Sequence, residues 1–298
     1  MNPPPVKPLK KRLGRIGLGT ATFGREIDPD DSFAMMDHAR VRGIALFDTA
    51  STYSDGISEQ VVGAWLASRR PGPDELVVAT KLRAPYTPKR IEEMLGRSLR
   101  YLGRESVELY YLHEWDDTAV DPTVLAALEE VVRSGKAGAL AVSNFSGEQL
   151  ERILRLQSEL GFTPFRAVQN NHNFAIRNVD DAVLRASAGH NLAVITYSPL
   201  GAGFLTGKHK GGVAPGSRFD IMPGHRKKYF QDQAWHRLAQ LEAAAARTGR
   251  SLPQLALAWV MRQPGINTVL VGGRTPAHLD QAFAALEFSA AEFPPELE

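Results

Sequence analysis

Short apolar runs alternate with longer segments of mixed polarity along nearly the entire chain. The apolar runs are rich in β-branched residues and end at turn residues, a pattern typical of buried strands. They predict eight strands, at 15–19, 43–48, 75–81, 107–112, 137–142, 166–170, 191–197 and 267–272. The segments between them predict helices at 57–70, 88–102, 121–134, 146–160, 179–189, 231–248, 251–263 and 276–287, with another after Asp28-Pro29. This alternation predicts one α/β domain over residues 1–298, a (β/α)8 TIM barrel.

Several of the expected helices begin at recognisable capping signals. Three starts place a capping residue directly before a proline at the first helical position: Thr87-Pro88, Asp121-Pro122 and Thr275-Pro276. Ser146 with Gln149 forms a capping-box pattern. Such side chains accept hydrogen bonds from backbone N–H groups of the first turn, so these helix starts are well marked.

Two segments depart from the regular alternation. Residues 1–12 are rich in proline and basic side chains, which predicts a loose arm or a small cap outside the core. Residues 199–230 follow the seventh expected strand, are rich in Gly, Lys and Arg, and lack a clear period. That segment is too long for an ordinary barrel connection, so we expect a functional loop or lid.

Polar side chains stand at the carboxyl ends of consecutive expected strands. Lys81 comes 33 residues after Asp48, and His113 comes 32 residues after Lys81. In a barrel these ends meet at one mouth, where such folds keep their chemistry. An ammonium there would compensate the Asp48 carboxylate and lower the pKa of the nearby Tyr53 phenol, making it a general acid or base near neutrality. His113 could orient a carbonyl oxygen or share the proton.

Each of these four residues also has a structural interpretation. An Asp or Lys at a strand end can form a plain ion pair, and a lone Tyr or His can simply pack. The four together, at barrel spacing, favour catalysis. A metal site fits less well, because His113 has no second histidine at ligand spacing and Glu114 and Asp116 are too few, so we expect no metal.

Composition narrows the choice of function. The formal net charge is +2, so no strong electrostatic case exists for nucleic acid or membrane as a partner. The chain has no cysteine, which excludes disulfides and thiol nucleophiles. Its start has no apolar signal region and no apolar run is long enough to span a membrane, so we expect a cytoplasmic protein.

The sequence resembles the aldo-keto reductases over essentially its entire length. The resemblance is carried by Gly17-Leu-Gly-Thr20, Phe47-Asp48-Thr-Ala-Ser-Thr-Tyr53, Ala79-Thr-Lys81, Tyr111-Leu-His113, Val142-Ser-Asn144-Phe145, Gln169, Tyr197-Ser-Pro-Leu-Gly201 and Val271-Gly-Gly-Arg274. It implies that Asp48, Tyr53, Lys81 and His113 are the catalytic residues.

The resemblance also implies a nicotinamide cofactor extended across the barrel mouth. Ser143, Asn144 and Gln169 would hold the carboxamide, and Tyr197 would stack on the nicotinamide ring. The pyrophosphate would lie under the segment of Ser198, Leu200, Gly201, Gly203 and Leu205, with Lys208 and Arg218 as charged contacts. The remaining contacts would come from Gly19, Thr20, Asp48, Gly272, Arg274 and His278. A guanidinium at Arg274 and a helix amino terminus suit a 2′-phosphate, which favours NADPH, with NADH possible.

The chain departs from the family pattern in three places. His278 and Ala282 stand where many members carry Gln and Asn to hold the adenine. His172 stands near a common tyrosine, and the chain ends without the long carboxyl-terminal loop of mammalian-type reductases. The substrate pocket would be formed by Tyr53, His113 and loop side chains at the expected mouth: Phe23, Tyr86, Trp115, Phe145, His172 and Phe230.

The expected function is NADPH-dependent reduction of an aldehyde, ketone or sugar carbonyl, with Tyr53 as general acid. The nearest relatives would be bacterial reductases, and the protein would be a monomer or weak homo-oligomer. A second hypothesis is a cofactor-sensing subunit resembling channel-associated β-subunits, although the chain shows no extra amino-terminal domain and no partner-binding insertion. A third, a metal-dependent barrel hydrolase, would require sensitivity to chelators.

Overall fold

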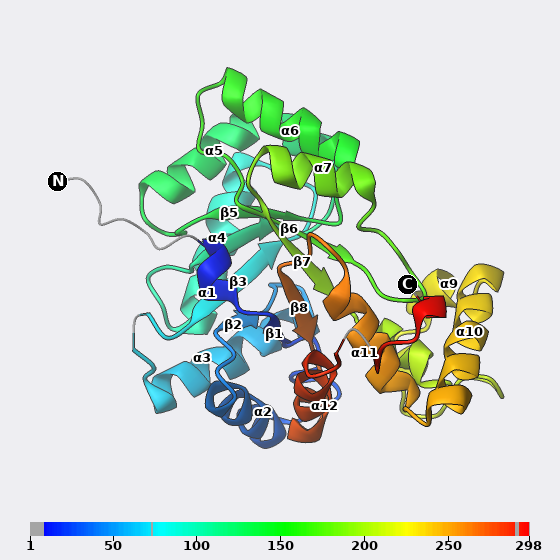
Figure 1. The fold of residues 1–298 in the computed structure, drawn as a ribbon. Helices are drawn as coiled ribbons and strands as arrows, with labels where there is room; N and C mark the ends of the chain where they lie inside the picture. The colour runs from blue at the N-terminus through cyan, green and yellow to red at the C-terminus, as the bar shows by residue number, and fades with distance from the viewer. Residues whose placement is uncertain (1–8, 73, 290–291, 298) are drawn as a thin grey trace.

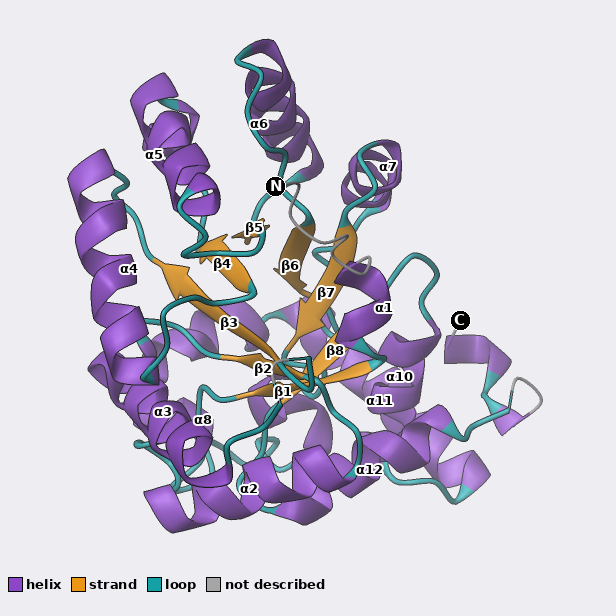
Figure 2. Ribbon diagram, turned by 90° about the vertical axis from the view of Figure 1, so that its left-hand side faces the viewer, coloured by secondary structure: helices purple, strands orange, loops and turns teal. Residues whose placement is uncertain are grey.

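Eight parallel strands form a closed barrel with helices around it (Figures 1 and 2). The computed structural model describes residues 9–72, 74–289 and 292–297. The strands are β1 (Ile16–Gly19), β2 (Leu46–Asp48), β3 (Val77–Leu82), β4 (Leu109–Leu112), β5 (Leu140–Ser143), β6 (Ala167–Asn171), β7 (Ala193–Tyr197) and β8 (Thr268–Val271). Strand β1 pairs with both β2 and β8, which closes the ring and confirms the predicted (β/α)8 barrel.

The helices follow the strands as the sequence predicts. They are α2 (Pro29–Val41), α3 (Ile57–Arg69), α4 (Pro88–Leu102), α5 (Pro122–Arg133), α6 (Gly147–Glu159), α7 (Asp181–Gly189), α10 (Asp232–Thr248), α11 (Leu252–Arg262) and α12 (Pro276–Leu286). Some strands are shorter than expected: Val107 and Ala137 pair in an isolated bridge ahead of β4 and β5 rather than within them. No described helix is long and apolar enough to cross a membrane.

The capping signals form as the sequence indicates. Thr87 accepts a hydrogen bond from a first-turn N–H of α4, and Asp121 does the same for α5. Ser146 and Gln149 form a complete capping box at α6. These bonds satisfy N–H groups that the helix leaves without partners and so place the helix starts against the barrel.

Side chains fill the interior of the barrel, so its mouth is a surface site and not a pore. Leu46, Val77, Leu109 and Tyr111 belong to this interior cluster and are almost completely buried. The fully buried Leu13 of α1 (Leu9–Leu13) packs against the same cluster at the amino ends of the strands. Helix α1 therefore acts as the small cap expected for this region, while residues 1–8 lie outside the described part of the chain. In barrels of this kind the catalytic residues lie at the opposite end, where the strands have their carboxyl ends.

The segment 199–230 contains short helices, although no periodicity predicted them. They are η3 (Gly201–Thr206), α8 (Arg218–Ile221), η4 (Pro223–His225) and α9 (Arg226–Tyr229). Each is too short to show a hydrophobic repeat. An aromatic cluster of Phe204, Phe219, Phe230 and Trp235 packs the segment against the start of α10.

Candidate active site

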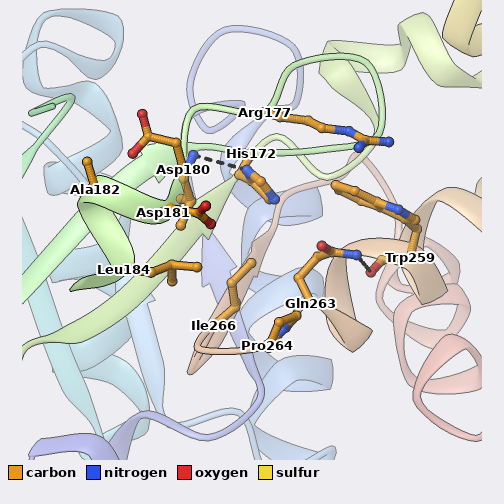
Figure 3. A pocket seen from close by; sticks show the side chains of 11 residues that line it. His172, Arg177, Asp180, Asp181, Ala182, Leu184, Trp259, Gln263, Pro264 and Ile266 are labelled. Carbon is orange, nitrogen blue, oxygen red and sulfur yellow. Dashed lines mark hydrogen bonds between the residues drawn. The ribbon is translucent and has the colours of Figure 1, made fainter. Parts of the chain in front are cut away.

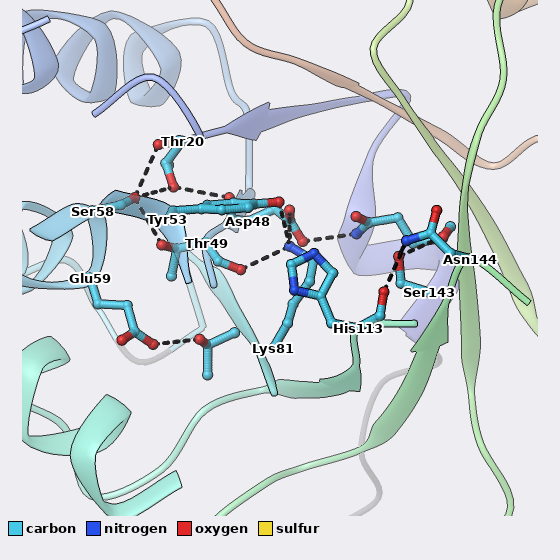
Figure 4. A network of polar contacts seen from close by, with 12 residues as sticks. Thr20, Asp48, Thr49, Tyr53, Ser58, Glu59, Lys81, His113, Ser143 and Asn144 are labelled. Carbon is cyan, nitrogen blue, oxygen red and sulfur yellow. Dashed lines mark hydrogen bonds and ion pairs between the residues drawn. The ribbon is translucent and has the colours of Figure 1, made fainter. Parts of the chain in front are cut away.

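Four polar side chains meet at the carboxyl end of the barrel (Figure 4). Asp48 ends β2, Lys81 lies next to the last residue of β3, and His113 directly follows β4. Tyr53 begins the short helix η1 (Tyr53–Gly56) after β2. The structure thus brings together the four residues that the sequence places at separate strand ends.

The ammonium of Lys81 is the centre of this group. Its Nζ donates to Asp48 Oδ2 at 2.5 Å and to the carbonyl oxygen of Thr49 at 2.8 Å. It also lies 3.3 Å from the hydroxyl oxygen of Tyr53. The ammonium therefore has three acceptors for its three protons, and its position is well defined. The carbonyl of Thr49 is a partner that no sequence pattern indicated.

Burial sets the strength of these contacts. The side chains of Lys81 and Asp48 are 0% and 2% exposed. Burial by itself disfavours the charged lysine, but the attraction of Asp48 and Tyr53 outweighs it, so the pKa of Lys81 is raised. Lys81 therefore stays cationic across the physiological range.

The pKa of Tyr53 differs from the sequence-based expectation. Burial of the phenol raises its pKa above the ordinary value of 10, although the ammonium of Lys81 lowers it in part. The predicted net lowering of the pKa is wrong in direction because no sequence pattern shows how completely the phenol is buried. Tyr53 is consequently a neutral O–H donor at neutral pH, the form that a general acid requires.

His113 is neutral as well. Its ring lies edge-on to Tyr53, with 5.9 Å between the ring centroids. Burial, helped by the charges of Lys81 and Arg83, lowers the pKa of His113 to about 3. Among the described residues Nδ1 has no hydrogen-bond partner. His113 can therefore orient an oxygen with the one N–H of its neutral ring, but it is not an imidazolium and does not transfer a proton as an acid at neutral pH.

A buried hydroxyl network supports the loop between Asp48 and Tyr53. Ser58 Oγ lies 2.8 Å from Thr20 Oγ1 and 2.9 Å from Thr49 Oγ1. Thr20 in turn donates to the carbonyl oxygen of Asp48 at 3.0 Å. These bonds join β1, β2 and α3 behind the four residues (Figure 4). Sequence reasoning missed Ser58, because hydroxyl contacts between separate elements leave no local pattern.

A second network lines the other side of the mouth. Tyr197 OH donates to Asn144 Oδ1 at 2.7 Å, and Asn144 Nδ2 donates to the carbonyl oxygen of His113 at 2.9 Å. Ser143 Oγ donates to the carbonyl oxygen of Gln169 at 2.8 Å. Gln169 Nε2 donates to Asp48 Oδ1 at 2.9 Å, which links this network to the first.

Comparison with known proteins identifies the family. Residues 15–294 match the model of the Aldo/keto reductase family. The chain belongs to this family. It is 29% identical over 93% of its length to an uncharacterized oxidoreductase, YrpG, of Bacillus subtilis, covering 89% of that protein. It is 28% identical to Protein tas of Escherichia coli, over 94% of this chain and 91% of that protein. A probable voltage-gated potassium channel subunit beta of Oryza sativa is also 28% identical, over 93% and 90% of the two chains.

Unusual backbone conformations and close backbone approaches lie at the mouth of this aldo/keto reductase. The turn after β7 has left-handed backbone at Ser198, Gly201, Ala202 and Gly203. A Cβ added to Gly272 would stand 3.0 Å from the carbonyl oxygen of Gly19, which is tighter than most real Cβ contacts. These positions let a ligand approach the backbone closely.

Basic side chains gather along the same rim. Burial lowers the pKa of Lys208, and the neighbouring guanidinium of Arg274 lowers it further. Arg218 forms an ion pair with Glu26 at 2.7 Å, a partner from the β1–α2 loop that sequence reasoning missed. Like charges held close together are destabilising unless an anion joins them. The donor set therefore suits the phosphates of a dinucleotide. His278 Nδ1 accepts from Thr275 N at 3.2 Å and holds the turn that carries Arg274.

Two predicted cofactor residues have no free side chain. Thr20 is fully buried, and its hydroxyl is engaged by Ser58 and Asp48. Leu205 is fully buried in the hydrophobic core. These two side chains contribute packing and support, so the predicted cofactor contacts of Thr20 and Leu205 would have to come from their backbone.

Most of the predicted substrate aromatics are also corrected by the structure. Phe23 and Phe145 are buried to at least 99% in the core. Tyr86 is equally buried and donates its hydroxyl to the carbonyl oxygen of Glu114 at 2.6 Å. Trp115 is partly exposed and packs edge-on against Phe145, so it keeps a place in the proposed pocket wall. An aromatic side chain in a loop can pack inward or face a ligand, and the sequence of the loop does not distinguish these two cases.

His172 lies beside Arg177 and Trp259 in the pocket shown in Figure 3. Its Nδ1 accepts from Val179 N at 3.1 Å, and its ring stacks on Trp259 of α11 at 5.3 Å. It lines a separate cavity of about 500 Å³ between α7 and α11, beside Arg177. Burial and the charge of Arg177 lower the pKa of His172 to about 4. The prediction that His172 forms a substrate wall is therefore wrong.

Proposed function

We propose that this aldo/keto reductase family oxidoreductase reduces an aldehyde, ketone or sugar carbonyl to the alcohol with NADPH. The observation that carries the proposal is the contact of a neutral, buried Tyr53 hydroxyl with a cationic Lys81 at 3.3 Å, beside a basic rim that suits a dinucleotide. When bound, the nicotinamide supplies a hydride to the carbonyl carbon.

The residues of the chain would manage the proton and the orientation. Tyr53 gives its proton to the carbonyl oxygen, and the Lys81 ammonium stabilises the phenolate that remains. His113 donates a hydrogen bond that orients the oxygen, which its neutral ring can do at physiological pH. Asp48 holds the ammonium in place. Trp115, partly exposed at the mouth, would contact the substrate.

The decisive experiment follows nicotinamide absorbance with NADPH, and separately NADH, across aldehydes, ketones and aldose sugars. We expect NADPH to support turnover of at least one class. If the protein binds neither cofactor, the proposal fails.

The choice of cofactor should depend on Arg274. Replacing it by serine removes the guanidinium expected at the 2′-phosphate, and charge-assisted bonds of this kind contribute about 10- to 100-fold in affinity. We expect Arg274→Ser to raise KM for NADPH by about that factor and leave KM for NADH nearly unchanged. Arg133→Ser, on the exposed face of α5, is the matched control. An equal loss with both cofactors would assign Arg274 a merely structural role.

The pH dependence should reflect the raised pKa of Tyr53. Reduction needs the protonated phenol, so kcat/KM for reduction should stay level through neutral pH and fall only above about 10, the ordinary phenol value. Alcohol oxidation needs the phenolate, so its rate should rise with pH toward the same range. Steady-state rates in both directions measure this. A fall in reduction near pH 7 would contradict the assignment of Tyr53 as the acid.

A second candidate is supported by the similarity to proteins named as potassium channel β-subunits. In that case the chain would bind NADPH, turn over slowly and act through a protein partner. Single-turnover kinetics discriminate the two: a sensing role predicts cofactor release slower than seconds and no substrate that accelerates oxidation of the bound cofactor. Among the described residues no cluster of potential ligands could hold a metal, and the hydrolase hypothesis receives no support.

A further inference from the structure

Two asparagines at the end of β6 contact both ends of the 198–229 segment. Asn171 is the last residue of β6, and Asn173 follows two positions later. The segment starts at Ser198, directly after β7, and closes at Tyr229, the last residue of α9. It carries Lys208 and Arg218 between those ends.

The first contact holds the start of the segment. Asn173 Nδ2 donates to the carbonyl oxygen of Ser198 at 2.9 Å. Asn173 Oδ1 accepts from the backbone N–H groups of Ala175 and Ile176 at 3.0 and 2.9 Å, so the amide cannot rotate freely. Ser198 has φ of 57°, a left-handed conformation that a serine keeps only when its surroundings fix it.

The second contact holds the far end. Asn171 Nδ2 donates to Tyr229 OH at 3.0 Å, and that hydroxyl lies 3.2 Å from Asn171 Oδ1. The two asparagines are themselves joined, because Asn173 Nδ2 donates to Asn171 Oδ1 at 3.1 Å. One connected set of polar groups therefore reaches from Ser198 to Tyr229.

The two ends also touch each other. A Cβ added to Gly201, which has φ of 59°, would lie 3.0 Å from the ring of Tyr229. The Tyr229 ring packs beside Phe204 with 6.1 Å between centroids. The turn that would cover the pyrophosphate thus rests on the tyrosine that ends the segment.

The polar groups of this set are buried, so the loss of any one of their hydrogen bonds is unfavourable. Asn171, Asn173 and Tyr229 are 1%, 0% and 2% exposed. A buried amide or hydroxyl that loses its hydrogen-bond partner destabilises the structure. Opening the segment at either end would leave several such groups without partners until water replaced them.

We propose that Asn171, Asn173 and Tyr229 are positioning residues that clamp both ends of the 198–229 segment and thereby limit the rate at which a dinucleotide enters and leaves the barrel mouth. The part concerning the dinucleotide rests on the proposed function. The part concerning the segment does not.

The test replaces Tyr229 by phenylalanine, which keeps the ring and removes the hydroxyl. Tyr110→Phe is the matched control, because Tyr110 is 1% exposed and, among the described residues, its hydroxyl has no partner. Without cofactor, we expect amide hydrogen exchange across 199–228 to be about five- to tenfold faster in Tyr229→Phe than in the wild type, and unchanged in Tyr110→Phe.

Cofactor release gives the second readout. Stopped-flow fluorescence should show NADPH leaving Tyr229→Phe about five- to tenfold faster, with the rate of the hydride step unchanged. Asn171→Ala should have a similar effect, and Tyr229→Phe added to it should cause little further change, since both remove the same bond. Unchanged exchange in 199–228 in both single variants would overturn the proposal. If wild-type protein bound no dinucleotide, the proposed function would fail while the exchange measurement still decided the clamp.

Discussion

Replacing Tyr53 by phenylalanine should lower kcat for carbonyl reduction by about 10²- to 10⁴-fold, the range for removal of a general acid. The hydroxyl is the only group lost, and the ring still fills its place beside His113. Affinity for NADPH should change little, because the phenol lies with the reacting groups and not on the basic rim. Cofactor binding by fluorescence and turnover by absorbance measure the two quantities separately.

Tyr110→Phe is again the control, since it removes from β4 a buried hydroxyl that has no hydrogen-bond partner among the described residues. It should keep wild-type turnover. If Tyr53→Phe retained more than about a tenth of the activity, another group would have to supply the proton, and the role assigned to Tyr53 would be wrong.

Replacing Lys81 by methionine should damage both stability and activity. Lys81 and Asp48 are buried and 2.5 Å apart, so the substitution leaves a carboxylate in the barrel without its cation. Breaking a buried pair from one side costs about 3–5 kcal/mol of the free energy of unfolding. Turnover should fall as well, because the phenolate of Tyr53 would lose its stabilising charge. Chemical denaturation and steady-state kinetics measure these effects.

An exposed ion pair of the same chain offers the comparison. Lys210 lies 2.9 Å from Glu242, and its side chain is 60% exposed. Lys210→Met should cost less than about 1 kcal/mol, since surface pairs contribute little. A similar small cost for Lys81→Met would mean that the buried carboxylate accepts a proton readily, and the assignment of Lys81 as a fixed cation would be contradicted.

Much of the fold was predictable because its signals are local. Strands such as Val77–Leu82 are buried on both faces and therefore read as continuous apolar runs. Capping residues such as Thr87 and Ser146 contact N–H groups three positions away, so the signal and its effect lie in one short segment. The regular spacing of Asp48, Lys81 and His113 then followed from one strand and one helix per repeat.

Side-chain direction was the part that remained hidden. Phe23, Tyr86 and Phe145 occupy mouth loops as expected, yet they pack inward. Whether a loop aromatic faces a ligand or the core depends on helices contributed by distant parts of the sequence. His172 illustrates this, since Trp259, 87 positions later in the chain, provides the surface on which it stacks.

The sequence by itself determined the barrel, its family and the four polar residues at its mouth, because these depend on apolar periodicity and on motifs within single strand ends. Only the tertiary structure decided how those residues behave. It showed that burial raises the pKa of Tyr53 and keeps His113 neutral, and it joined Asn171 to Tyr229 across 58 positions. Burial and hydrogen bonds between distant segments arise from the packing of the entire chain, so no local stretch of sequence encodes them.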